Sequence, residues 1–215
     1  GADICGFIGN TNKDLCARWY ALGAFYPFAR NHNDKESISQ EPYVDMFKNN
    51  TIGKSENFTY TDFIREASLK RYALHRYHYS YTHQASTDNI LYFKPLFYDY
   101  PEESDAYKRV ENNILLGDSV KISPILDMFS TFTFYFPGKD VTWCPIWPKY
   151  QKDCLTGGNY QEINVPQDEI IAHIKGGSIL PLQLDDFFRV SQNINLENLK
   201  DLPLDLGILT DKDHN

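Results

Sequence analysis

The chain has 215 residues, of which 42% are hydrophobic, and a formal net charge of −8. This length and composition predict ordinary packed cores, in one large or two small globular domains. An acidic chain without clustered Lys and Arg is not expected to bind nucleic acid, and no apolar run approaches the roughly 18 residues of a membrane-spanning helix.

A short helix is predicted near the start of the chain, between residues 11 and 22. Thr11 or Asn12 can cap its N-terminus, and Asp14 favours its first turn, where negative charge is stabilised. The apolar residues at i, i+4 and i+7 are Leu15, Trp19 and Leu22. This spacing predicts one apolar face.

Polar side chains stand at the ends of two apolar runs that flank this helix. One run ends at Asp3, and the other, residues 22–28, is followed by Arg30, Asn31 and His32. Unalternating apolar strands on either side of a helix are typical of a βαβ unit in a buried parallel sheet. We therefore expect Asp3 and His32 to share one rim of the sheet, with Arg30 as the ion-pair partner of Asp3.

Residues 33–60 are polar and lack periodicity, which predicts a long loop with at most short helical turns. Two N-glycosylation sequons lie in it, Asn49-Asn50-Thr51 and Asn57-Phe58-Thr59. Asn49 and Asn57 are therefore candidate glycosylation sites on a surface loop.

The four cysteines fall into two local pairs, Cys5 with Cys16 and Cys144 with Cys154, and each pair closes a short loop. Even, paired spacing predicts two disulfides, whereas a zinc site would require closer Cys pairs or His ligands at similar spacing. Together with the sequons, the disulfides predict a secretory or lysosomal route.

Residues 61–84 form the longest helical pattern, with Thr61 as the expected cap. One face of this helix comprises Tyr60, Ile64, Ala67, Leu74 and Tyr81. His75 and His78 are spaced to share a metal, and His83 follows, but the pattern lacks a third ligand. We expect these histidines to be packed or on the surface.

Beyond residue 89 the pattern changes to short aromatic and β-branched runs about ten residues apart, which is typical of a β-sandwich. The expected strands lie in residues 91–98, 119–122, 131–136, 161–165 and 170–175. The segment from Trp143 to Trp147 is expected to be a disulfide-held hairpin rather than an exposed aromatic ledge. Residues 204–209 resemble a strand with no visible partner, which predicts a final domain that is cut off.

Distinctive motifs follow one another along the chain. They are GADICGF at 1–7, LCARW at 15–19, GAFYPFARNHN at 23–33, EPY at 41–43, RYAL at 71–74, KPLF at 94–97 before YP at 100–101, ISPI at 122–125, and KGGSILP at 175–181. Together they resemble glycoside hydrolase family 31, in its lysosomal and brush-border α-glucosidase branch. The resemblance covers nearly the whole chain.

This resemblance implies a fold that combines α/β and all-β parts. Residues 1–88 would form the C-terminal end of a TIM (β/α)8 barrel, residues 89–184 a β-sandwich, and residues 185–215 the start of a second, truncated β-domain. It also implies a retaining enzyme that releases terminal α-linked glucose from maltose-like or glycogen-like oligosaccharides. Neither a cofactor nor a metal is implied.

The resemblance further implies that His32 and Phe7 line the sugar pocket. Asp3 is a further candidate for contact with the sugar, and Arg30 would support Asp3 from behind. The nucleophile and acid/base motifs of the family are absent, so both catalytic carboxylates are expected upstream in the same polypeptide, and the fragment alone is expected to be inactive. The alternatives are a non-catalytic carbohydrate-binding or structural module and α-xylosidase specificity.

Overall fold

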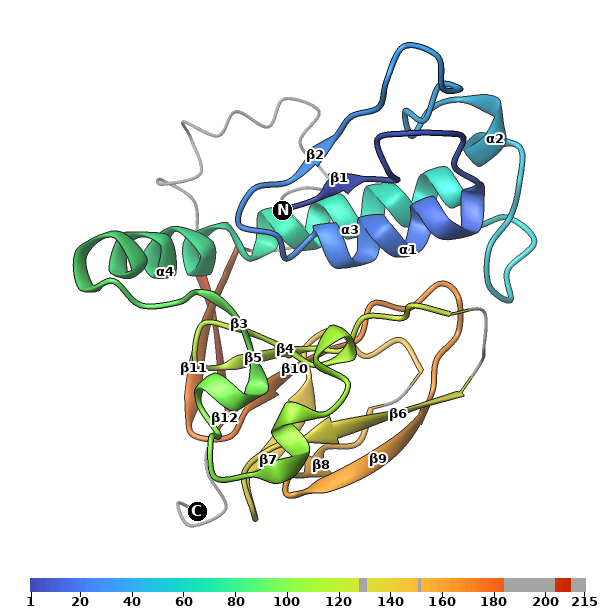
Figure 1. Ribbon diagram of the computed structural model, residues 1–215. Helices are drawn as coiled ribbons and strands as arrows, with labels where there is room; N and C mark the ends of the chain where they lie inside the picture. The colour runs from blue at the N-terminus through green and yellow to red at the C-terminus, as the bar shows by residue number, and fades with distance from the viewer. Residues whose placement is uncertain (128–130, 151, 184–203, 210–215) are drawn as a thin grey trace.

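The computed structural model describes the chain except for residues 128–130, 151, 184–203 and 210–215. Figure 1 shows two regions, a helical region over residues 1–88 and a β region from residue 89 onward. The chain is thus a mixed α/β unit followed by sheets, and the described residues do not form a closed barrel.

The helical region begins with the predicted βαβ unit. Its elements are β1 (Asp3–Ile4), α1 (Lys13–Gly23) and β2 (Arg30–Asn31). β1 and β2 pair in parallel, and Asp3 lies opposite Arg30. The prediction that residues 22–28 form the second strand is wrong, because Leu22 and Gly23 complete α1 and the chain then turns through Phe25.

Helix α1 starts as predicted, and two of the three residues of its predicted apolar face, Trp19 and Leu22, pack against the core. The Asn12 side chain caps it by accepting a hydrogen bond from the Leu15 backbone N–H at 2.9 Å. Its buried residues are Cys16, Ala17 and Gly23, whereas Leu15 is 46% exposed. A Cβ at Gly23 would lie 2.5 Å from the side chain of Ile4, so the glycine permits close packing of α1 on β1.

The loop after β2 contains one short helix, α2 (Asp45–Lys48), as expected for residues 33–60. The long helix predicted over residues 61–84 is two helices, α3 (Tyr60–Ala73) and α4 (His75–Asp88). Thr59, rather than Thr61, caps α3 in a reciprocal capping box with Asp62. Two different packing partners explain the break at Leu74: α3 packs on α1, and α4 packs beside β11.

Within its described residues, the β region contains one six-stranded sheet, in the order β3-β4-β5-β10-β7-β8, and two strand pairs, β6-β9 and β11-β12. The sheet strands are β3 (Phe93–Pro95), β4 (Ile114–Leu116), β5 (Val120–Ile122), β7 (Thr142–Pro145), β8 (Leu155–Thr156) and β10 (Ala172–Lys175). The paired strands are β6 (Thr131–Phe136), β9 (Asn159–Asn164), β11 (Ser178–Gln183) and β12 (Leu204–Leu209). Three short 3-10 helices cover Leu96–Tyr98, Ser104–Tyr107 and Val110–Asn112.

Two of the sequence predictions concern strand partners in this region. The prediction that residues 204–209 lack a partner is wrong, because β12 pairs antiparallel with β11. The disulfide-held hairpin is confirmed, since β7 pairs antiparallel with β8 next to the Cys144–Cys154 disulfide, which closes the loop between the two strands. Trp143 in that hairpin is fully buried.

Successive side chains of a strand point to opposite sides of a sheet. In the six-stranded sheet both sides are buried. The face toward the helices includes Leu116, Val120, Ile122, Ala172 and Ile174. The face toward β6 and β9 includes Leu115, Trp143 and Ile171. In neighbouring strands Lys121 lies opposite His173, and both are buried.

Candidate functional site

Two aromatic rings stack where β1 and β2 end. Beyond β1 the backbone turns through Cys5 and Gly6, both with positive φ, and Phe7 follows. His32 comes directly after β2. The ring centroids of Phe7 and His32 are 5.3 Å apart and the ring planes differ by 27°. Both side chains are exposed, so a ligand can reach them.

Asp3 and Arg30 form the ion pair that the sequence predicts. The Arg30 guanidinium donates from Nη2 and Nε to one oxygen of Asp3, at 2.8 and 3.1 Å. The Arg30 side chain is 52% exposed. An exposed ion pair contributes only about 0–1 kcal/mol to the free energy of unfolding. It therefore orients the Asp3 carboxylate more than it stabilises the fold.

A disulfide between Cys5 and Cys16 joins the end of β1 to α1. It closes the loop that contains Phe7, and thereby limits how far this ring can move from the strand. The predicted pairing of Cys144 with Cys154 is also present, in the β region.

A buried amide bonds the segments that bear the two rings, and sequence analysis missed it. Gln40 is 2% exposed, and its side chain donates to backbone carbonyls at the end of β1 and to the side chain of Asn31. Asn31 in turn donates to the hydroxyl of Tyr20 on α1. Burial raises the pKa of Tyr20. The only sequence signal is that Gln40 directly precedes the EPY motif.

The histidines of α4 are packed or exposed side chains. His78 is buried, and its Nδ1 contacts the Tyr92 hydroxyl. Burial lowers the pKa of His78 to about 4. Within the described part of the chain, no group of three or more His, Cys, Asp or Glu side chains is placed to hold a metal ion.

Both sequon asparagines lie in the loop between β2 and α3. Asn49 follows α2, Asn57 lies shortly before α3, and both are exposed. A glycosyl group can therefore be accommodated at either position.

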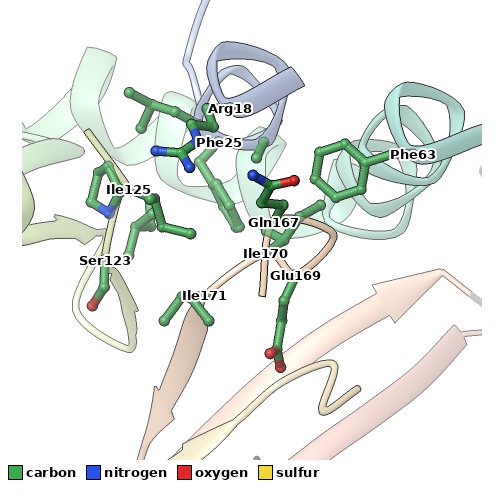
Figure 2. A pocket seen from close by; sticks show the side chains of 13 residues that line it. Arg18, Phe25, Phe63, Ser123, Ile125, Gln167, Glu169, Ile170 and Ile171 are labelled. Atoms are coloured by element: carbon green, nitrogen blue, oxygen red, sulfur yellow. The ribbon is translucent and has the colours of Figure 1, made fainter. Parts of the chain in front are cut away.

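Several hollows in the described part of the chain lie apart from the stacked rings, among them two that border α1 and α3. Figure 2 shows one between α1, α3 and the loop before β10, with the Glu169 carboxylate directed away from Arg18. The volume available to water molecules in this hollow is about 20 Å³. This volume can hold one or two water molecules but not a sugar ring. The second is an open groove of about 430 Å³ along α1, β2 and α3.

Sequence models of one enzyme family match both regions. A model described as the glycosyl hydrolases family 31 TIM-barrel domain matches residues 1–81. A model described as the glycosyl hydrolase family 31 C-terminal domain matches residues 89–180. Lysosomal alpha-glucosidase from Mus musculus is 36% identical over 200 residues, covering 85% of this chain and 20% of the mouse protein. The chain thus spans about one fifth of the length of this relative.

Solved structures share the fold. The chain is similar to the ER glucosidase II heterodimeric complex of a catalytic subunit and the binding domain of a regulatory subunit, with a TM-score of 0.79 and 24% identity over 99% of this chain and 21% of the other. A dextranase from Flavobacterium johnsoniae, complexed with glucose, gives a TM-score of 0.77 and 21% identity over 98% of this chain and 24% of the other. Among the residues described, no helix has the length and apolar composition needed to cross a membrane.

Proposed function

The chain belongs to glycosyl hydrolase family 31, and we propose that it forms one wall of the sugar pocket of a retaining α-glucosidase. The observation that supports this most directly is the exposed stack of Phe7 on His32 at the ends of two parallel strands. Ligand sites of parallel α/β folds lie at such strand ends. A ring face packs on the C–H surface of a sugar, and imidazole nitrogens exchange hydrogen bonds with its hydroxyls.

Residues 1–88 are proposed to be the C-terminal end of a (β/α)8 barrel. The parallel pair of β1 and β2 with α1 between them is the repeating unit of such a barrel. Residues 89–184 are proposed to form a β-sandwich behind it, and residues 185–215 the start of a second β-domain. Of this last range the structure describes only β12, which pairs with β11.

The bond-breaking groups are proposed to come from the preceding part of a longer polypeptide. Retaining glycosidases require two carboxyl groups about 5 Å apart, one as nucleophile and one as acid/base. In this arrangement His32 and Phe7 bind the glucosyl unit to be released. Asp3, held by Arg30, shapes the pocket beside them and is a further candidate for contact with a hydroxyl.

The proposed substrates are terminal α-linked glucosyl units of maltose-like or glycogen-like oligosaccharides. The α-glucosidase relatives support this choice. The proposed route is secretory, ending in the lysosome or outside the cell. The two disulfides and the exposed Asn49 and Asn57 support this route.

Kinetics of a His32→Ala variant of the full-length polypeptide test the proposal. We expect kcat/KM for an aryl α-glucoside to fall about 100-fold, or about 3 kcal/mol of transition-state stabilisation. His83→Ala, at an exposed position of α4, is the matched control and should leave kcat/KM unchanged. Unchanged kinetics of His32→Ala would contradict the sugar-binding role. Faster hydrolysis of the matching aryl α-xyloside would instead favour α-xylosidase specificity, and sugar binding without hydrolysis a non-catalytic module.

A further inference from the structure

Gln40 lies where the chain segments that bear the two stacked rings meet. Its side-chain nitrogen Nε2 is 3.2 Å from the carbonyl oxygen of Ile4, 3.2 Å from that of Gly6 and 2.7 Å from the side-chain oxygen of Asn31. Gly6 directly precedes Phe7, and Asn31 directly precedes His32. One side chain therefore binds the immediate neighbour of each ring-bearing residue.

The orientation of the Gln40 amide follows from these partners. Two of the three are backbone carbonyl oxygens, which only accept hydrogen bonds. The donor end of the amide must therefore face them, and the two N–H groups are shared among three oxygens. A side chain without a donor at this position would leave these oxygens without those bonds.

A second hydrogen bond returns from β2 to the same residue. The Asn31 side-chain nitrogen donates to the backbone carbonyl of Gln40 at 2.8 Å and to the Tyr20 hydroxyl at 2.7 Å. Asn31 and Gln40 are thus bonded in both directions, and Tyr20 connects them to α1. These bonds join β1, α1, β2 and the following loop in one network.

The strand pairing itself does not reach the rings. β1 and β2 pair at only two positions, Asp3 with Arg30 and Ile4 with Asn31. Beyond them the backbone N–H of Asp34 donates to the carbonyl of Phe7 at 3.0 Å. The Gln40 amide is therefore the buried polar link next to the point where the two segments leave the sheet.

We propose that Gln40 is a positioning residue that holds the Phe7 and His32 segments at the separation their stacked rings require. This inference rests on the proposed sugar-binding role of these rings. Gln40 does not touch the sugar. It acts through the backbone of Gly6 and the side chain of Asn31.

A Gln40→Glu variant of the full-length polypeptide provides a test with a distinctive pH dependence. The carboxylate keeps the shape of the amide and faces three oxygens without a donor, whereas the protonated acid regains one donor. We expect kcat/KM for an aryl α-glucoside, relative to the wild type at the same pH, to fall about 10-fold to 100-fold at pH 7. At pH 4 the same ratio should recover at least about fivefold.

Two further variants complete the test. Gln40→Met lacks a hydrogen-bond donor at every pH, so its kcat/KM relative to the wild type should be low at both pH 4 and pH 7. Gln84→Glu introduces the same charge at an exposed position of α4 and should leave the ratio near one. If Gln40→Glu does not fold, Gln40→Met decides the test. A folded Gln40→Met variant with the same kcat/KM as the wild type overturns the inference, and a lower kcat/KM at both pH values supports it.

The outcomes separate this inference from the proposed function. If His32→Ala loses activity while Gln40→Glu and Gln40→Met do not, the positioning role is wrong and the sugar-binding role stands. If His32→Ala is unchanged, both proposals fail.

Discussion

The stacked rings at the ends of β1 and β2 and the core rings of the β region are used in opposite ways. Phe7 is 42% exposed and stacks on an exposed histidine, while Phe134, Phe136 and Trp143 are fully buried. Buried rings stabilise the β region through apolar area removed from water. The stacked rings are exposed, and hydrogen bonds, an ion pair and a disulfide hold their segments. The segments that bear the stacked rings are thus fixed by directional bonds, and the core of the β region by packing.

The largest effect that this comparison predicts is in the β core. Trp143 is fully buried, and its indole N–H donates to the carbonyl of Pro137 at 2.9 Å. Trp143→Ala in the full-length polypeptide should lower the free energy of unfolding by about 3–5 kcal/mol, measured by urea unfolding. Tyr79→Ala, at a 71% exposed ring, should change it by less than about 0.5 kcal/mol. Equal effects of the two variants would break the comparison.

The two disulfides offer a matched test between the regions. They close loops of similar length, with sequence separations of 11 and 10, so removing either should destabilise the protein by about 3 kcal/mol. Only replacement of Cys5 and Cys16 by Ala should also weaken the binding of glucose, because that loop contains Phe7. Equal glucose affinity in both double variants, measured by calorimetry under conditions where both are folded, would contradict the positional role of the first disulfide.

A smaller effect concerns an ionisable group in the β core. The Lys121 ammonium lies 4.3 Å from the ring centroid of Phe136, donates to the Ser123 hydroxyl at 2.6 Å and lies opposite His173. Burial lowers the pKa of Lys121 from 10.5 to about 7. Burial and the Lys121 charge lower the pKa of His173 to about 3.

The sign of the pH dependence follows from the lowered pKa of Lys121. Between pH 7 and pH 10.5 the unfolded chain binds a proton that the folded chain has released, so stability rises with pH there and is lost as the pH falls. Lys121→Met should therefore stabilise the fold by about 1–4 kcal/mol at pH 6 and by much less at pH 10.5, measured by urea unfolding. Lys35→Met, at an exposed lysine, should show no such difference. An equal gain at both pH values would contradict the buried-charge explanation.

Local patterns were sufficient for part of the fold and site. The Asn12 cap, the βαβ unit, the Asp3–Arg30 pair and both disulfides follow from spacings of a few residues or from one register between adjacent strands. The short strands β4 and β11 escaped prediction, because three to six residues that are buried on both faces or interrupted by proline show no alternation.

The sequence by itself determined the family resemblance, the two-part organisation and the residues expected at the strand ends, because these depend on residue types and short spacings. Tertiary structure alone decided that the helix breaks at Leu74, that β12 pairs with β11, and that Gln40 bonds both ring-bearing segments. Each of these depends on which surfaces meet in the folded chain. Packing and buried hydrogen bonds between distant segments override local preference, since a buried polar group left unpaired costs about 1–3 kcal/mol.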